Sequence, residues 1–206
     1  LVVVLIMQLL WWFGIHGPNV MSAVTTPFMT KMMATNLELY QSGEGVTSAG
    51  VFYTSGSQYS IISGPFGAGW FSPTGSGITM GLIIAVMLFS KRDDFKAIAK
   101  LAIPCGIFNI NEPIIFGIPM VMNPMFAVPF FLAPVACVCC GYLVQSLGLC
   151  PLFVIDVPWT TPVGLFGFLA SSGNIMGAIW QAVIILGVST LIYTPFVIAA
   201  NRQEAE

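Results

Sequence analysis

The sequence predicts an all-α integral membrane protein with about five transmembrane helices and two re-entrant hairpins. Of the 206 residues, 57% are hydrophobic and only 7% are charged, whereas soluble domains carry roughly 25% charged residues. The apolar residues run in blocks and do not alternate, which is atypical of a β-barrel. At about 20 residues per spanning helix, the length accommodates five or six spans with loops.

Composition excludes two further classes of protein. Six basic residues against eight acidic ones give a formal charge of −2, so the chain lacks the basic excess of a nucleic-acid-binding protein. Intrinsic disorder requires low hydrophobicity and high charge, which is the opposite of this composition. The chain opens at Leu1, inside an apolar run and without a basic leader, so we expect no signal peptide and a fragment of a longer protein.

The cysteines are expected to be small core residues. They lie in or beside apolar segments without CxxC spacing, at Cys105, Cys137, Cys139, Cys140 and Cys150. The one histidine has no partners at metal-ligand spacing either. We therefore expect no metal site and no bound cofactor.

The first half of the chain alternates apolar and polar segments. The run Leu1–Phe13 predicts a first helix, which continues in broken form to about Met33. The stretch Thr35–Ser63 is rich in Ser, Gly, Thr and Gln without an apolar period, which predicts an extracellular or cavity-lining loop. The apolar segment Gly77–Ser90 predicts the next helix.

Charge placement predicts the orientation of the chain. Four of the six basic residues lie in the stretch 91–100, which the positive-inside rule predicts to be a cytoplasmic loop. A shorter apolar segment, Phe95–Phe108, overlaps and follows that stretch. Met125–Leu147 and Asn174–Ala200 are each long and apolar enough to span a bilayer.

Two apolar segments, 66–77 and 104–124, are full of Pro and Gly. Irregular backbone at membrane depth is tolerated only where it is buried in protein or lines a wet cavity. Interrupted apolar segments also point to the binding site of a transporter. Both segments are therefore predicted to be re-entrant hairpins, with kinked helices or surface loops as the alternative.

Glu112 is the first candidate for chemistry. It lies in a long uncharged segment, where a carboxylate is costly to bury and by default marks a functional site. Asn109 and Asn111 beside it offer amide donors and acceptors, which suit a ligand rich in hydroxyl groups. The alternative is a structural glutamate that bridges two helices.

His16 and two tryptophans lie beside predicted helix breaks. His16 is flanked by glycines and followed by Pro18, which predicts an interruption that exposes the imidazole to a cavity; a satisfied core histidine is the alternative. Trp11 and Trp159 each lie near such an interruption, and a flat indole suits the apolar face of a pyranose ring. An interfacial aromatic belt explains them equally well. Asp156 fits either a cavity or the aqueous boundary.

Three motifs carry a family resemblance. The segments FNINEPIIFG (108–117), WWFGIHG (11–17) and PWTTP (158–162) resemble those of enzyme IIC, the membrane component of the bacterial phosphotransferase system. More narrowly, they resemble the lactose/cellobiose/diacetylchitobiose family. The resemblance spans essentially all of residues 1–206 but corresponds to the C-terminal half of such a protein. It implies a sugar-binding and transport part of an enzyme IIC domain that lacks the N-terminal spans.

The resemblance also implies an activity and partners. A disaccharide of the cellobiose, diacetylchitobiose or lactose type enters a cavity, and a phosphocysteine on enzyme IIB phosphorylates its C6 hydroxyl. His16 and Glu112 would lie near that hydroxyl as catalytic residues, and Trp11 and Trp159 would flank the sugar rings. The family further implies a multi-pass protein of the bacterial cell membrane, embedded in lipid and dimerising through its N-terminal spans. We add Asn109 and Asn111 as sugar ligands from their position beside Glu112.

Two other functions stay open. A proton-coupled secondary sugar transporter would use Glu112 as its proton site and deliver unmodified sugar. A channel or a structural membrane subunit would have no saturable ligand. No nucleotide-binding motif occurs, so any phosphoryl donor must come from another protein.

Overall fold

The computed structural model describes residues 1–202 and is mostly helical, as the sequence predicts, whereas residues 203–206, with Glu204 and Glu206, lie outside the described part. The elements in chain order are α1 (Val2–Trp12), α2 (Gly17–Gln41), β1 (Val46–Thr47), β2 (Gly50–Val51), α3 (Gly64–Trp70), α4 (Met80–Phe89), α5 (Asp93–Ile107), α6 (Glu112–Gly117), α7 (Pro124–Ser146), α8 (Leu165–Ala170), α9 (Ile175–Ala182), the π-helical η1 (Val183–Val188) and α10 (Ser189–Ala200).

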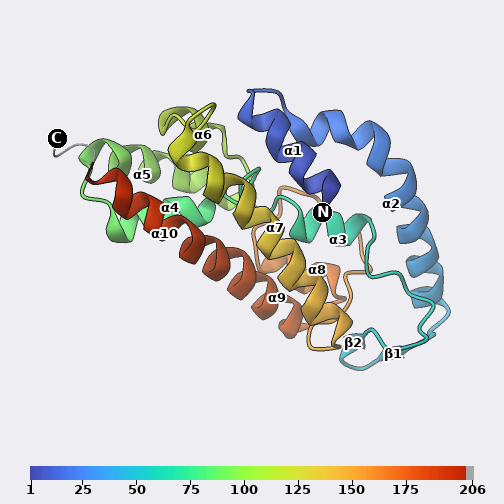
Figure 1. Ribbon diagram of the computed structural model, residues 1–206. Helices are drawn as coiled ribbons and strands as arrows, with labels where there is room; N and C mark the ends of the chain where they lie inside the picture. Colours follow the sequence, from blue (N-terminus) through green and yellow to red (C-terminus); the bar gives the residue numbers. More distant parts are fainter. Residues whose placement is uncertain (203–206) are drawn as a thin grey trace.

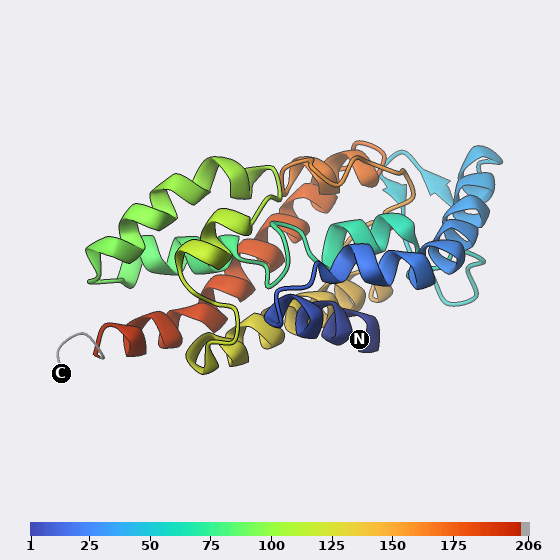
Figure 2. The same cartoon turned by 90° about the horizontal axis from the view of Figure 1, so that it is seen from above.

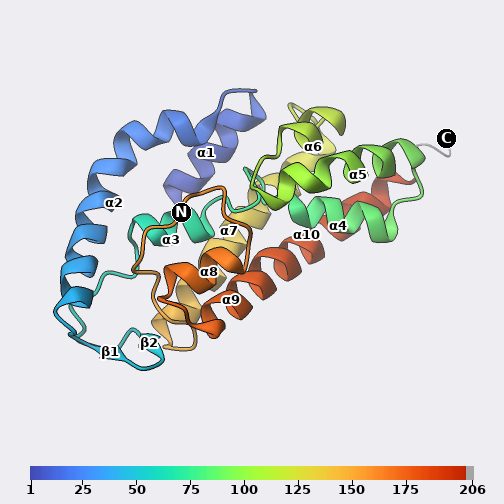
Figure 3. The same ribbon diagram turned by 180° about the vertical axis from the view of Figure 1, so that it is seen from behind.

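Two long helical units form the centre of the molecule. One is α7, and the other is the unbroken run of α9, η1 and α10 that packs against it (Figure 1). The helices α4 and α5 pack together and α4 lies along α10 at the end near the C-terminus (Figure 2). At the opposite end lie the β1–β2 hairpin and the last turns of α2. Figure 3 shows the orange segment before α8 passing beside α3.

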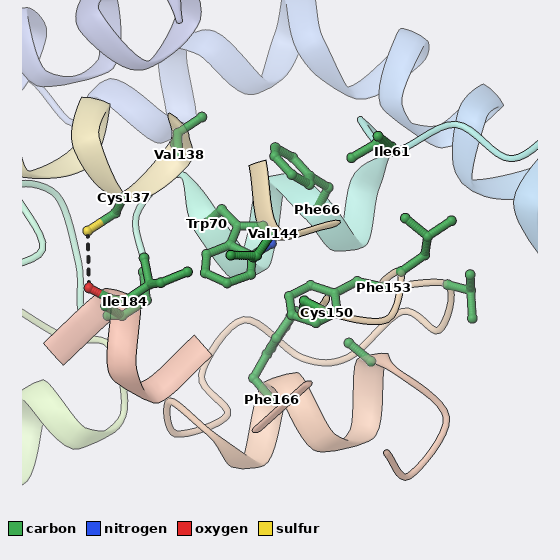
Figure 4. Packing of buried hydrophobic residues seen from close by; sticks show 14 of the residues in the cluster. Ile61, Phe66, Trp70, Cys137, Val138, Val144, Cys150, Phe153, Phe166 and Ile184 are labelled. Atoms are coloured by element: carbon green, nitrogen blue, oxygen red, sulfur yellow. Dashed lines mark hydrogen bonds between the residues drawn. The ribbon is translucent and has the colours of Figure 1, made fainter. Parts of the chain in front are cut away.

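The core has two parts. In the first, the Trp70 indole of α3 stacks on Phe153 with ring centroids 5.4 Å apart, and Phe166 of α8 meets Phe153 edge-on (Figure 4). The second part joins α4, α5, α6, α10 and the first half of α7. Tyr193 in this part is fully buried and donates a hydrogen bond to the carbonyl of Gly77 over 2.8 Å. Both parts therefore hold the non-helical segment after α3 in place.

Three predicted helices are confirmed with small shifts of their ends. They are the helices expected over 77–90, 125–147 and 174–200, which the structure has as α4, α7 and the run from α9 to α10. Within residues 1–202, two helices are long and apolar enough to cross a membrane, Pro124–Ser146 and Ile175–Ala200. The predicted break between Phe13 and Pro18 is also confirmed, because α1 ends at Trp12 and α2 begins at Gly17.

The predicted polar loop was wrong at its start. Helix α2 runs beyond Met33 to Gln41, so the first residues of the stretch 35–63 are helical. The buried amide of Asn36 explains this, because its Nδ2 donates to the Ser60 carbonyl and its Oδ1 accepts from the Ser60 N–H, each over 2.8 Å. A long-range pair of this kind anchors the helix end to the loop that follows.

The predicted loop 91–100 was also wrong, since α5 begins at Asp93. Two carboxylates in the first turn favour a helix start, because the helix dipole is positive there. Arg92 lies 2.5 Å from the Asp94 carboxylate, and this hydrogen-bonded guanidinium lowers the pKa of Asp94. Pro104 lies inside α5, so the irregular backbone expected from 104 begins only at Phe108.

Candidate functional site

Four interruptions of the helices carry the contacts that define the candidate site. They are residues 13–16, 71–79, 108–111 and the segment 157–162. The first and third follow α1 and α5, the second separates α3 from α4, and the fourth precedes α8. Three of them carry residues that the sequence points to, namely His16, Asn109 with Asn111, and Trp159, and the second is hydrogen-bonded to Asn109 and Asn111.

Asn109 joins three of these segments through its side-chain amide. The residue is buried and its backbone is left-handed, with φ at 66°. Its Oδ1 accepts a hydrogen bond from the Thr74 N–H over 2.6 Å. Its Nδ2 donates to the carbonyl of Trp159 and, over 3.0 Å, to the carbonyl of Thr161. The Asn109 amide was expected to bind a ligand, but both its oxygen and its nitrogen are hydrogen-bonded to backbone groups.

Asn111 and Gln8 hold the same loop from two directions. Asn111 donates from Nδ2 to the Ser76 carbonyl over 2.7 Å, and Gln8 of α1 accepts from the Gly77 N–H over 2.8 Å. Gly75 has a left-handed φ of 87°, and a Cβ there would lie 2.5 Å from the Asn111 Cβ. Only glycine therefore allows Asn111 to approach so closely.

His16 caps the start of α2 and packs beside Trp11. Its Nδ1 accepts a hydrogen bond from the Asn19 N–H over 3.3 Å, which is a helix-capping contact. The imidazole is otherwise exposed, and its centroid lies 5.0 Å from that of the Trp11 ring. Since Nδ1 accepts, Nε2 is the ring nitrogen that is left to carry the proton.

Glu112 opens α6 and is half-buried. Within the described residues its carboxylate forms no hydrogen bond and no ion pair. Phe116 lies four residues later, on the same side of α6, and its ring centroid is 6.4 Å from that of Trp11. The spacing of four residues places Glu112 on the same side of α6 as Phe116, and Trp11 also contacts His16.

Trp159 differs from Trp11 in its surroundings. Trp11 is only 5% exposed, whereas Trp159 is 62% exposed on the segment that Asn109 anchors. The structure thus brings together Trp11, His16 and the α6 helix of Glu112. Within residues 1–202 Trp159 has no ring contact with them, and its backbone carbonyl accepts a hydrogen bond from Asn109 Nδ2.

The sequence-based interpretation missed Gln8 and Ser76. Both are buried, and the Nε2 of Gln8, the Oγ of Ser76 and the Nε1 of Trp11 have no hydrogen-bond partner in the described part of the chain. The signal for Gln8 was present, since it is the only polar residue between Leu1 and Leu10. Ser76 carries no such signal, because its burial arises from distant contacts.

The chemistry of these groups suits a neutral, hydroxyl-rich ligand. A free carboxylate and an imidazole are able to accept and donate protons, and the indole ring offers an apolar face. In residues 1–202 no three His, Cys, Asp or Glu side chains lie close enough to hold a metal ion. The basic side chains lie on other segments, in α2, at the start of α5 and near the C-terminus.

Comparison with known proteins gives consistent matches. A family model described as "Phosphotransferase system, EIIC" matches residues 1–134. The "PTS system cellobiose-specific EIIC component" of Lactococcus lactis subsp. lactis (strain IL1403) is 36% identical over 219 residues, which cover 99% of this chain and 43% of that protein. The "PTS system oligo-beta-mannoside-specific EIIC component" of Bacillus subtilis (strain 168) is 35% identical, with coverages of 98% and 43%.

Two further matches concern a fused protein and a solved structure. The "PTS system lactose-specific EIICB component" of Staphylococcus aureus is 34% identical, covering 91% of this chain and 31% of that protein. The crystal structure of the transporter ChbC, the IIC component from the N,N'-diacetylchitobiose-specific phosphotransferase system, matches with a TM-score of 0.87 and 32% identity. That match covers 99% of this chain and 44% of ChbC. The chain thus spans less than half the length of these relatives.

Proposed function

The chain belongs to the EIIC family of the phosphotransferase system, and on that premise we propose that it forms the sugar-binding part of a membrane permease. Its substrate is a disaccharide of the cellobiose, diacetylchitobiose or lactose type, the sugars for which several matched relatives are named. The observation that carries the proposal is the contact of Trp11 with both His16 and the α6 helix that Glu112 opens. It supports a site that offers a carboxylate and an imidazole to one ligand and is bounded by the buried Trp11 ring.

The proposed reaction is transfer of a phosphoryl group to the C6 hydroxyl of the sugar. The donor is a phosphocysteine on EIIB, and a matched lactose protein carries the combined name EIICB. The P–S bond breaks, a P–O bond forms at C6, and the sulfur leaves as the EIIB thiolate. Glu112 takes the hydroxyl proton, while His16 donates from Nε2 to an oxygen of the incoming phosphoryl group. Such positioning and charge stabilisation are what phosphoryl transfer chiefly requires.

The other site residues have binding roles in this proposal. Trp159 stacks on a sugar ring with its exposed indole, and Trp11 bounds the site beside His16. Asn111 reaches a sugar hydroxyl with Oδ1, which forms no hydrogen bond within residues 1–202. Asn109 as a direct sugar ligand stays a prediction. The bonds of its amide to three backbone groups support a positioning role instead.

The same premise supports a membrane arrangement. We propose that the segments 66–77 and 104–124 form two re-entrant hairpins, among about five spans in the bacterial cell membrane. The start of α5, where basic residues gather, lies on the cytoplasmic side, and EIIB approaches from there. Dimerisation through N-terminal spans outside these 206 residues remains part of the proposal.

A transport experiment tests this function against its strongest competitor. Glu112 has no ion-pair partner in the described residues, which favours a proton-coupled transporter as the second candidate. Labelled cellobiose, diacetylchitobiose and lactose are offered to membrane vesicles containing the protein, with and without phosphorylated EIIB. We expect the 6-phosphosugar inside, only with the donor. Unmodified sugar that accumulates without the donor and is lost when the proton gradient collapses would establish the competitor.

A further inference from the structure

Both backbone groups of Gly77 are held by side chains from different helices. Its N–H donates to the Oε1 of Gln8 on α1, and its carbonyl accepts from the hydroxyl of Tyr193 on α10, each over 2.8 Å. Gln8 and Tyr193 are both fully buried. Gly77 has a left-handed φ of 79°, and a Cβ there would overlap the Phe130 ring. The loop before α4 is therefore held between α1 and α10.

One peptide group connects Gln8 to the start of α6. The N–H of Gly77 and the carbonyl of Ser76 belong to the same peptide group, and that carbonyl accepts from the Nδ2 of Asn111 over 2.7 Å. Because a peptide group is planar and rigid, a shift at its N–H end also moves its oxygen. Asn111 is buried and directly precedes Glu112. The position of this peptide group therefore bears on the position of Glu112.

The helix that carries Gln8 also carries the residue beside His16. Trp11 lies three residues after Gln8, on the same side of α1. Its ring centroid is 5.0 Å from that of His16. Gln8 thus lies between two groups of contacts, with Trp11 and His16 on one side and the peptide group that holds Asn111 on the other.

The hydrogen bonding of Gln8 indicates a role other than stability. Every other residue of α1 is apolar or aromatic. The Nε2 of Gln8 is buried without a hydrogen-bond partner in the described part of the chain, and such a group is costly. A methionine at this position would avoid that cost, and choices that reduce stability are expected at functional sites. What Gln8 provides is the acceptor for the Gly77 N–H.

We propose that Gln8 is a positioning residue for phosphoryl transfer, acting through Gly77 together with Tyr193. The inference rests on the proposed function, in which Glu112 takes the proton of the C6 hydroxyl and His16 meets the phosphoryl group. Gln8 orients the peptide group that holds Asn111, and so sets the place of Glu112 relative to His16. Phosphoryl transfer depends on such placement, and a displacement of about 1 Å lowers a rate by as much as about 100-fold.

Gln8→Met tests this role, because it removes the acceptor and keeps an unbranched side chain of similar length. The Kd for cellobiose is measured by calorimetry on the full-length protein, and the rate of 6-phosphocellobiose formation is measured with phosphorylated EIIB at saturating cellobiose. We expect the rate per bound sugar to fall at least about tenfold, and the Kd to rise by no more than about threefold. A merely structural role would lower the amount of bound cellobiose and leave the rate per bound sugar unchanged.

Gln145→Met is the matched control. Gln145 on α7 is also fully buried and also uses one atom of its amide, since its Nε2 donates to the Pro151 carbonyl over 2.9 Å. Its Oε1 has no partner among the described residues. The turn that it holds follows α7 and contains no residue of the candidate site. The same substitution there should leave the Kd and the rate per bound sugar near wild type.

Tyr193→Phe is a second variant, because it keeps the ring and removes only the hydroxyl that holds the Gly77 carbonyl. It should lower the rate per bound sugar at least about threefold, and it decides the question where Gln8→Met binds no cellobiose. A rate per bound sugar in Gln8→Met within about twofold of wild type overturns the positioning role, while the proposed function stands. If the wild-type protein forms no 6-phosphocellobiose with phosphorylated EIIB, the proposed function falls and the positioning role falls with it.

Discussion

The side-chain oxygen of Asn109 accepts a hydrogen bond from the backbone N–H of Thr74 over 2.6 Å, across 35 positions of sequence. Both residues have left-handed backbones, with φ of 66° and 63°. The nitrogen of the same amide donates to carbonyls on the segment that carries Trp159. One buried side chain thus sets the spacing between the segment that precedes Glu112 and two other loops of the site.

Replacing Asn109 with Asp should break the hydrogen bonds to the Trp159 segment and keep the hydrogen bond from Thr74. Aspartate tolerates a left-handed backbone and keeps the acceptor for Thr74, but it turns an oxygen towards the carbonyls of Trp159 and Thr161. We expect a loss of about 1–3 kcal/mol in the free energy of unfolding and a cellobiose Kd raised at least fivefold. Denaturant titration in micelles and calorimetry measure the two effects.

Asn123→Asp is the control for this change. Asn123 caps α7 by accepting from the Met125 N–H over 3.0 Å, which an aspartate still does. Its Nδ2 also donates to the Pro119 carbonyl over 2.8 Å, but at an exposed position, where water replaces the bond that the aspartate loses. Stability and sugar binding should stay near wild type. Equal effects of the two substitutions would show that the Asn109 amide has no special part in positioning the loops.

Gly75→Ala should destabilise the protein more than an alanine at a comparable glycine. The new methyl group would overlap Asn111, and φ at Gly75 is 87°. Gly56 has a φ of 90° with nothing within 4 Å of its Cβ position, so Gly56→Ala adds only backbone strain of about 1–2 kcal/mol. We expect Gly75→Ala to cost about 2 kcal/mol more than this control, measured by denaturant titration. Equal losses of unfolding free energy in Gly75→Ala and Gly56→Ala would mean that Asn111 moves aside without an energetic cost.

Trp159→Ala should weaken sugar binding without destabilising the protein. The side chain is 62% exposed, so the free energy of unfolding should change by no more than about 0.5 kcal/mol. Loss of the stacking surface should raise the Kd for cellobiose about tenfold. Phe28→Ala, at an aromatic residue of α2 that is 67% exposed, should leave that Kd unchanged. Unchanged binding in Trp159→Ala would remove Trp159 from the site.

The sequence predicted the long apolar helices and the family more reliably than the short elements. The helices α7 and α9–α10 follow from blocks of apolar residues, and the family resemblance of the three motifs is confirmed by the matches. Helix α8 was missed, because its six residues are too few to show a helical period. At residues 91–100 the charges that predict orientation also favour a helix start, so a loop was wrongly expected there.

The side-chain partners within the site were beyond sequence reasoning. Asn109 was predicted to bind sugar because it lies beside Glu112. Its side-chain amide instead forms hydrogen bonds to backbone groups 35, 50 and 52 residues away. The same holds for Gln8, whose side chain accepts a hydrogen bond from the N–H of Gly77, 69 residues away. Such contacts depend on how the loops pack in three dimensions. The sequence indicates which residue types lie near the site. Only the structure shows which of them are free to bind a ligand and which of them hold loops in place.

The proposed role of Glu112 is tested most directly by measuring the phosphorylation of bound cellobiose by phosphorylated EIIB in the Glu112→Gln variant. Glutamine keeps the size of the side chain and removes its ability to take the C6 hydroxyl proton. We predict that cellobiose still binds and that the rate of 6-phosphocellobiose formation falls at least about 100-fold. The control Glu38→Gln, on α2 and exposed, should react at the wild-type rate. A wild-type rate in Glu112→Gln would show that this carboxylate does not serve phosphoryl transfer.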